Sequence, residues 1–170
     1  MISIIMKKVV KFGGSSLANA EQFQKVGDII RSDESRRYVV PSAPGKRFSA
    51  DTKVTDLLYT CYGKAEAGED FTDVLTEIKG RFYEIIKGLN LDLSLEEEFR
   101  QIEADFKAHA GNEYAASRGE FLNGKVMAAY LGYEFIDSAT VIRFDKNGNF
   151  DADKTDKLLS KRLQKCERAV

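Results

Sequence analysis

The sequence predicts an α/β fold in which a mainly parallel sheet lies between two layers of helices, a three-layer αβα sandwich. Three observations favour this class. An apolar run over residues 9–12 ends in two glycines, as a buried strand before a turn does. Apolar residues at helical spacing follow between Phe23 and Ile30, and a second apolar run covers residues 38–40. Strand, helix and strand in this order form a unit that favours parallel pairing.

The first helix has a recognisable start. Asn19 is followed three residues later by Gln22, which is the spacing of a capping box, and Phe23 begins the apolar face directly afterwards. We therefore expect this helix to begin after Asn19 and to end near Arg31.

The stretch from about residue 54 to residue 112 predicts a layer of helices inserted into the α/β domain. Apolar residues recur at helical spacing over residues 54–62, 71–86 and 95–106. A second capping-box pattern, Ser94–Glu97, precedes the last of these helices. No linker rich in Pro, Gly or Ser separates the stretch from its flanks, so we expect a single domain.

The last third of the chain predicts a return to α/β structure. A helix is expected from near Ser117 to about Leu131, followed by a short third strand at Phe135–Ile136. A hairpin is expected over residues 141–150 around Asn147-Gly148, and a final helix over residues 157–163. Residues 168–170 resemble the start of another strand. A sheet with so few strands is thin, so we expect residues 1–170 to be the first part of a larger domain.

Composition excludes several classes of function. The 170 residues carry 26 Lys and Arg against 27 Asp and Glu, so no basic surface for nucleic acid is predicted. Cys61 and Cys166 stand alone, which favours neither a disulfide framework nor a zinc site and suits a reduced, cytoplasmic protein. No run approaches the roughly 20 apolar residues of a membrane span. We assign no residue as a metal ligand and expect no membrane partner.

The end of the first strand has the composition of a phosphate-binding turn. Glycines let backbone N–H groups approach a ligand closely, and successive N–H groups form a concavity that binds anions. Lys11 brings an ammonium group to Gly13 and Gly14, and Ser15 and Ser16 add hydroxyl donors. The motif is neither a P-loop nor a dinucleotide fingerprint. A tight turn with a solvated lysine explains the same residues, so both interpretations stay open at this point.

A second loop is predicted at the same edge of the sheet. Ligands of parallel α/β sheets bind beyond the carboxyl ends of the strands. Residues 41–47 follow the second strand just as Gly13–Ser15 follow the first. Two strand ends therefore point at one crevice.

Three motifs, taken together, resemble the aspartate kinase family of the amino-acid kinase fold. Their order and approximate spacing match, and the resemblance extends along essentially the whole chain. The motifs are Lys11-Phe12-Gly13-Gly14-Ser15-Ser16, then Ser42-Ala43-Pro44-Gly45 with Val54-Thr55-Asp56-Leu57-Leu58, then Ser117-Arg118-Gly119-Glu120.

The resemblance implies transfer of the ATP γ-phosphoryl group to the β-carboxylate of L-aspartate, with Mg²⁺, as the first step of aspartate-family amino-acid biosynthesis. It implies that Lys11 contacts the transferred phosphate, that Ser42 and Thr55 hold the aspartate, and that Glu120 pairs with its α-ammonium group. The nucleotide-binding residues it implies are Lys11, Phe12, Gly13, Gly14 and Ser15. It also implies that the rest of the kinase domain and the regulatory ACT domains lie outside residues 1–170, and that the full-length protein is a homo-oligomer.

The chemistry agrees with the composition. A carboxylate is already a nucleophile at neutral pH, so catalysis needs positioning and charge neutralisation and no general base. The single histidine, His109, has no partner motif and is expected at the surface. The fragment alone is expected to be inactive.

Each implied role has a structural alternative. Ser117 and Glu120 have capping-box spacing, and Thr55 could be the N-cap of its helix. Ser42 could serve only the backbone of its own loop, and Lys46 with Arg47 are expected to be solvated. At the level of function, the alternatives are a non-catalytic nucleotide-binding or interaction module, or another amino-acid kinase such as a glutamate 5-kinase.

Overall fold

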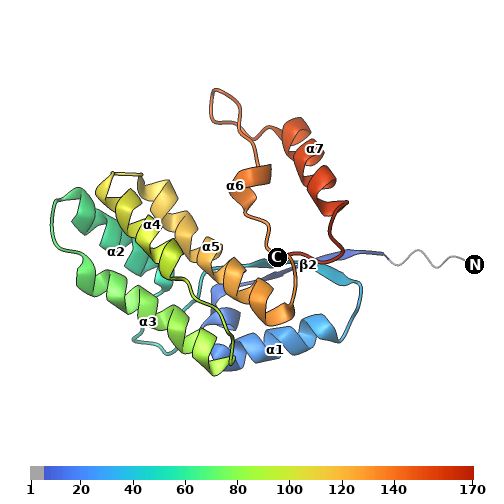
Figure 1. Ribbon diagram of the computed structural model, residues 1–170, viewed down its shortest axis with the longest axis horizontal. Helices are drawn as coiled ribbons and strands as arrows, with labels where there is room; N and C mark the ends of the chain where they lie inside the picture. The colour runs from blue at the N-terminus through green and yellow to red at the C-terminus, as the bar shows by residue number, and fades with distance from the viewer. Residues whose placement is uncertain (1–5) are drawn as a thin grey trace, which may run out of the picture.

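The computed structural model describes residues 6–170 of the chain. Its strands and helices alternate at the N-terminus and give way to helices in the middle (Figure 1). In chain order the elements are β1 (Lys8–Phe12), the 3₁₀ helix η1 (Gly14–Leu17), α1 (Ala20–Arg31), β2 (Arg36–Pro41), α2 (Val54–Glu66), α3 (Thr72–Gly88), α4 (Glu96–Lys107), α5 (Asn112–Leu131), α6 (Ser138–Val141) and α7 (Ala152–Leu163).

The sheet is parallel, as the β-α-β order predicts. β1 pairs with β2, with Val10 opposite Val39 and Lys11 opposite Val40. The chain end extends this sheet, because the N–H of Val39 donates to the carbonyl oxygen of Ala169 at 2.9 Å. The predicted third strand pairs in turn with the chain end through parallel bridges at residues 134–136 and 168–170. Both segments form isolated bridges, not full strands.

Helices cover both sides of this sheet, which confirms the αβα layering (Figure 1). α1 and α5 lie on one side, and α6 and α7 on the other. Side chains alternate along each strand. Val10 and Phe12 of β1 and Val39 of β2 face the α1 and α5 layer, whereas Val9 and Val40 face the other way and remain exposed.

The predicted N-terminus of α1 is confirmed. Asn19 is its N-cap, and the side-chain oxygen of Asn19 accepts a hydrogen bond from the N–H of Gln22 at 3.0 Å. The side chains of Phe23, Val26 and Ile30 are buried against the sheet and α5. Local spacing thus identified both the start and the buried face of this helix.

α2, α3 and α4 form the predicted helical layer at one end of the molecule, where α2 and α4 pack against α5 and α3 packs against α2 (Figure 1). One hydrophobic core runs from η1 through α1 and these helices to α5. Aromatic rings join the layer, as where Tyr62 of α2 meets Phe106 of α4 edge-on with centroids 5.4 Å apart. That this layer is an insertion within one kinase domain stays a prediction.

Two local expectations are wrong. α5 begins at Asn112, five residues before Ser117, so Ser117 and Glu120 lie inside the helix and form no capping box. α4 has Leu95 as its N-cap, and the Oγ of Ser94 accepts from the N–H of Glu96 at 3.3 Å. The predicted hairpin around Asn147-Gly148 does form. Residues 144 and 150 make an antiparallel bridge, and the N–H of Asp151 donates to the carbonyl oxygen of Arg143 at 2.9 Å. Of its predicted residues, only 141 belongs to α6.

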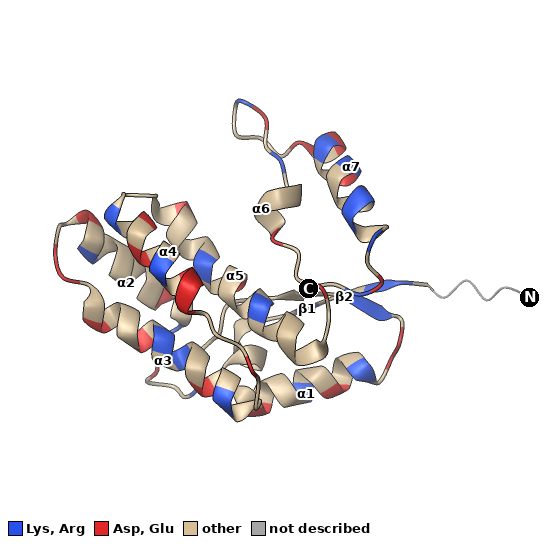
Figure 2. Ribbon diagram, in the orientation of Figure 1, with Lys and Arg blue, Asp and Glu red and all other residues tan. Residues whose placement is uncertain are grey.

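Charges of both signs are spread over the helices (Figure 2).

His109 is exposed just after the end of α4 and, as predicted, lies at the surface. Among residues 6–170, no helix is both long and apolar enough to cross a membrane.

Candidate functional site

A cavity of about 490 Å³ opens at the carboxyl ends of β1 and β2, where the sequence predicts a crevice. Four segments form its wall: the turn after β1, the loop after β2, the start of α2 that directly follows this loop, and the middle of α5. The lining residues are Gly14, Ser15, residues 42–46, Lys53, Thr55 and Glu120. Five of the predicted site residues, Gly14, Ser15, Ser42, Thr55 and Glu120, thus lie around one space.

The two loops touch through glycines packed back to back. A Cβ on Gly14 would lie 2.6 Å from the carbonyl oxygen of Ala43, and a Cβ on Gly45 would lie 2.6 Å from the carbonyl carbon of Gly14. The N–H of Gly45 donates to the carbonyl oxygen of Gly14 at 2.8 Å. Glycine is therefore required at positions 14 and 45 because the two loops approach closely. A positive φ is not the reason, because Gly13 is extended at φ −78° and Gly14 begins η1.

Gly13 and Lys11 lie beside this cavity wall without lining it. A Cβ on Gly13 would meet no protein atom within 4 Å, so the backbone there is open to a ligand. Lys11 is exposed on the sheet face opposite Val10 and Phe12. Within residues 6–170 its ammonium group makes no hydrogen bond or ion pair. The phosphate-binding role of Lys11, and that of Phe12, stay predictions.

Ser42 is held by its backbone and leaves its hydroxyl group available. Its N–H donates to the carbonyl oxygen of Phe12 at 3.0 Å, and its own carbonyl oxygen accepts from the Nδ2 of Asn123 at 2.7 Å. In the described part of the chain, the Ser42 hydroxyl group has no hydrogen-bond partner. The Ser42 side chain is therefore not needed by its own loop.

Thr55 is the second residue of α2, and the N-cap of that helix is Lys53. The N-cap alternative for Thr55 is therefore wrong. Thr55 is half-buried and lines the cavity from the first turn of the helix. Its position beside a helix N-terminus suits a group that helps to bind a carboxylate.

Glu120 faces the cavity from the third turn of α5 and is exposed. One carboxylate oxygen accepts a hydrogen bond from the N–H of Ala43 at 3.3 Å. The preceding residue, Gly119, lets the loop approach α5, since a Cβ there would lie 2.6 Å from the Cβ of Ala43. Glu120 thus presents a negative charge beside Ser42 and Thr55, as an ammonium partner would.

Sequence reasoning missed Asn123, which lies one helical turn after Glu120. Its side chain is fully buried, its Nδ2 donates to Ser42 as described above, and its Oδ1 is buried without a partner among residues 6–170. A polar residue three positions from Glu120 on the same helix face was the available signal.

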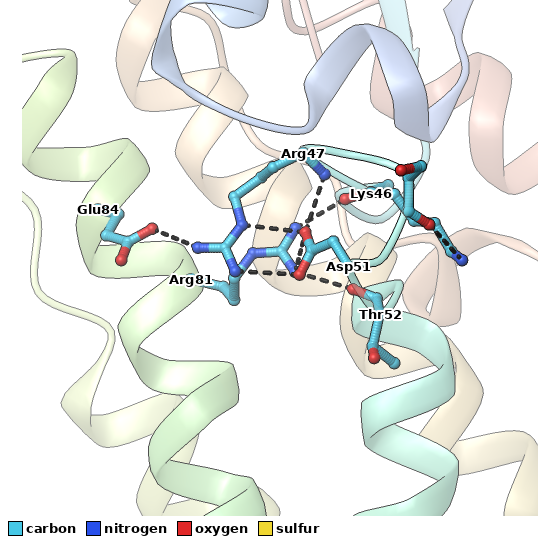
Figure 3. Close-up of polar contacts among 8 residues, drawn as sticks. Lys46, Arg47, Asp51, Thr52, Arg81 and Glu84 are labelled. Carbon is cyan, nitrogen blue, oxygen red and sulfur yellow. Dashed lines mark hydrogen bonds and ion pairs between the residues drawn. The ribbon is translucent and has the colours of Figure 1, made fainter.

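A network of ion pairs supports the loop after β2 from behind (Figure 3). Arg47 binds Asp51 through Nε and Nη2, each at 3.0 Å, and binds Glu84 through Nη1 at 2.8 Å. The expectation that Arg47 is solvated is therefore wrong, because Asp51 folds back onto it within the same loop. Lys46 is exposed and lines the cavity.

The carboxylate of Asp51 is the centre of this network. Hydrogen bonds from Arg47, together with the charge of buried Arg81, hold the pKa of Asp51 well below its usual range. Arg81 reaches Asp51 from α3 at 3.1 Å. Burial lowers the pKa of Arg81. The sequence offered no signal for the contacts of the loop with α3, because Arg81 and Glu84 lie on a different segment from Arg47 and Asp51.

Among residues 6–170, no three His, Cys, Asp or Glu side chains gather so as to hold a metal ion. These residues therefore do not fit a Mg²⁺ ion held by protein ligands alone.

A wider, mostly apolar groove of about 880 Å³ adjoins the cavity and shares Thr55 and Glu120 with it. It lies between α5, the end of β2 and residues 135–144. Two of the three predicted aspartate-binding residues, Thr55 and Glu120, thus lie at the junction of two hollows.

Comparisons with known sequences agree with the motifs. The chain is 39% identical over 141 residues to Aspartokinase 3 of Bacillus subtilis, covering 79% of this chain and 31% of that protein. It is 32% identical over 136 residues to the chloroplastic Aspartokinase 1 of Arabidopsis thaliana, covering 72% of this chain and 23% of that protein. The chain therefore spans about a third or less of the length of these relatives.

Comparisons with solved structures agree with the fold. Clostridium acetobutylicum aspartate kinase matches with a TM-score of 0.93 and 46% identity, over 97% of this chain and 38% of that one. Escherichia coli aspartokinase III, solved in complex with aspartate and ADP, shares the fold with a TM-score of 0.73 and 24% identity, over 93% of this chain and 38% of that one. Residues 6–166 match the amino acid kinase family. The chain belongs to the amino acid kinase family.

Proposed function

We propose that the chain forms the N-terminal part of the catalytic domain of an aspartate kinase, which transfers the γ-phosphoryl group of ATP to the β-carboxylate of L-aspartate. One observation carries the proposal. Ser42, Thr55 and Glu120 come from three separate elements and converge on the glycine turn after β1 around a single cavity. The aspartokinase relatives named above support the same reaction.

The cavity offers complementary groups for an amino-acid substrate. The free hydroxyl group of Ser42 and that of Thr55 can donate to a carboxylate, and the exposed carboxylate of Glu120 can pair with an α-ammonium group. A substrate held at both ends keeps its β-carboxylate in a defined place. Positioning of this kind supplies most of what phosphoryl transfer requires.

The glycine turn supplies the other half of the reaction. Its open backbone at Gly13 and the N–H groups that begin η1 form the anion-binding concavity for the nucleotide phosphates. Lys11, at the end of β1 and without a protein partner in residues 6–170, neutralises charge on the transferred phosphoryl group. Mg²⁺ enters with ATP as the counter-ion of its phosphates.

Cys61 and Cys166 are both buried and free, which suits a reducing compartment such as the cytoplasm. We place the full-length kinase there as a homo-oligomer, with the remaining kinase half and ACT regulatory domains outside residues 1–170.

The test uses the full-length kinase, meaning the longer protein that contains this chain. The acyl phosphate is trapped as a hydroxamate, with L-aspartate or L-glutamate as acceptor in parallel reactions. We expect product with aspartate that requires both ATP and Mg²⁺. Product with glutamate alone would favour a glutamate 5-kinase, and nucleotide binding without product would favour a non-catalytic module.

Glu120→Gln tests the substrate orientation in the same assay. Loss of the charge-assisted contact to the α-ammonium group is expected to raise the KM for aspartate roughly tenfold, which corresponds to about 1.5 kcal/mol of binding free energy. This is the lower end of the usual range, because Glu120 is exposed. The KM for Mg-ATP serves as the internal control and should not change. A variant that melts at a lower temperature but keeps its KM for aspartate would contradict the assigned role.

A further inference from the structure

Arg81 of α3 connects the helical layer to the loop after β2, and its side chain is only 2% exposed. Its Nη2 donates to the carbonyl oxygen of Gly45 at 2.7 Å, and its Nη1 donates to that of Thr52 at 2.9 Å (Figure 3). The same Nη1 lies 3.1 Å from Asp51 Oδ2. The two carbonyl groups stand at opposite ends of residues 45–52. One guanidinium group therefore spans this loop.

Burying this charge carries a desolvation cost. The Nε of Arg81 has no hydrogen-bond partner among residues 6–170, so one of its donors is buried unsatisfied. Desolvation therefore offsets part of the attraction between Arg81 and Asp51. The two carbonyl contacts, by contrast, act directly on the position of the loop.

Those contacts lead directly to the glycine turn. Arg81 holds the carbonyl group of Gly45, and the N–H of the same residue donates to Gly14 at 2.8 Å. Gly14 and Gly45 approach so closely that neither position has room for a Cβ. A shift of Gly45 therefore displaces the turn after β1 or opens the contact between the two loops.

Asp51 and Arg47 fix the orientation of Arg81 from the other side. Asp51 accepts three hydrogen bonds from Arg47, including one from its N–H at 2.8 Å, and so presents Oδ2 to Arg81 in a single position. Glu84, one turn after Arg81 on α3, binds the far side of Arg47 at 2.8 Å. The loop is thereby attached to α3 at two points.

We infer that Arg81 is a positioning residue, which holds Gly45 against Gly14 and so sets the separation between the phosphate-binding turn and the loop that carries Ser42. The inference rests on the proposed function, in which that separation places the γ-phosphoryl group relative to the β-carboxylate. A helix of the inserted layer thus determines the alignment of two substrates that it does not touch.

The test compares Arg81→Lys and Arg81→Met with wild type in the full-length kinase. A lysine keeps the positive charge, but its ammonium group lacks the planar fork that reaches both carbonyl groups at once. Methionine removes the charge and keeps the bulk. Ile78→Val is the matched control, since Ile78 is fully buried on α3 one turn earlier and has no part in the network. It lowers stability without moving the loop.

The kinetic measurement is kcat per folded molecule, well below the melting temperature of each variant. Both Arg81 variants are expected to lower kcat by about 10- to 100-fold, because misplacement by about 1 Å costs on the order of 100-fold. KM for each substrate should stay within about threefold, since the binding groups remain on their own elements. Ile78→Val should keep wild-type kcat. Variants of Arg81 with wild-type kcat would overturn the inference.

A second measurement does not depend on activity. Amide hydrogen exchange reports the N–H of Gly45, whose partner is Gly14. We expect faster exchange at Gly45 in both Arg81 variants and unchanged exchange in Ile78→Val. Unchanged exchange at Gly45 in the Arg81 variants would overturn the inference. If wild type formed no acyl phosphate, the proposed function would fail, and the exchange measurement would still decide whether Arg81 positions the loop.

Discussion

Glu120 and Asn123 show how neighbouring positions on one helix serve a site and its support. Residues three apart lie on the same face of a helix. Glu120 presents its carboxylate to the cavity, while buried Asn123 holds the carbonyl group of Ser42 from behind. The loop that carries Ser42 is therefore attached to α5 through the N–H of Ala43 and the carbonyl oxygen of Ser42. The hydroxyl group of Ser42 remains free to bind a ligand.

At the scale of single residues, Lys11→Ala is expected to separate function from stability. Loss of one preorganised charge on the transferred phosphoryl group should lower kcat of the full-length kinase by on the order of 100-fold or more. Thermal stability should hardly change, because Lys11 is exposed and makes no ion pair within residues 6–170. Steady-state kinetics and thermal melting measure the two effects.

Lys8 provides the control on the same strand. Its ammonium group pairs with Asp33 at 2.8 Å, and it lies at the end of β1 away from the glycine turn. Lys8→Ala should leave kcat unchanged and cost at most about 1 kcal/mol of stability, as exposed ion pairs do. Near-normal turnover of Lys11→Ala would contradict the role assigned to Lys11.

At the scale of elements, the loop between β2 and α2 depends on charges that it does not itself supply. Asp51 lies in the loop, but one of its two arginine partners, Arg81, comes from α3. The network joins elements whose helical and strand patterns give no hint of contact. Its strength should therefore depend on the ionisation of one carboxyl group.

The free energy of unfolding measured below neutral pH tests this dependence. The arginines lower the pKa of Asp51 in the folded state, so the unfolded chain binds a proton at this carboxyl group at higher pH than the folded chain does. The contribution of Asp51 to stability is therefore fully present above its unfolded pKa of about 3.9 and is lost as pH falls further. Asp51→Asn should be less stable than wild type at neutral pH, and the difference should shrink between about pH 4 and pH 2.

Urea unfolding at a series of pH values measures this effect. Asp73→Asn is a suitable control, because Asp73 is an exposed carboxylate of α3 outside the network. A stability difference between wild type and Asp51→Asn that stayed constant down to pH 2 would show that the ion pairs do not depend on this carboxylate.

At the scale of the whole molecule, one face of the sheet is only partly covered. Val9 is 67% exposed and Val40 is 50% exposed, on the face opposite the α1 and α5 layer. Lys11 lies on the same face, opposite Val40 and between Val9 and the glycine turn. The edge of the sheet that carries the glycine turn therefore borders a surface that α6 and α7 leave open.

The 170-residue chain by itself is expected to form no detectable acyl phosphate. The cavity has walls from four segments, but the chain spans only 38% of the C. acetobutylicum enzyme that it matches, and in-line transfer needs both reactants held. Mg-ATP should bind no tighter than about 1 mM, or about −4 kcal/mol. Calorimetric titration and the hydroxamate assay test both statements. Turnover by the purified chain would show that residues 1–170 suffice.

Sequence reasoning succeeded where the controlling contacts are short. The N-cap of α1 and its buried face depend on residues three or four apart, and both were predicted correctly. The start of α5 was placed five residues too late, because the first turns of that helix carry no capping pattern and pack on α2. Ser117 and Glu120 have the spacing of a capping box, but both lie inside α5 and not at its N-terminus.

The sequence by itself determined the β-α-β unit, the two loops at one edge of the sheet and the residues whose types suit phosphate and aspartate. The unit, the loops and the phosphate-binding composition follow from periodicity and side-chain chemistry, whereas the aspartate-binding roles are what the resemblance of the motifs implies. Only the tertiary structure decided that Gly14 packs on Gly45, that Asn123 holds Ser42, and that Arg81 holds the loop. The partners in the last two contacts are 81 and 36 residues apart, so no local pattern records them. They arise only when the core brings α3 and α5 against the loop, because buried polar groups then need partners wherever the chain supplies them.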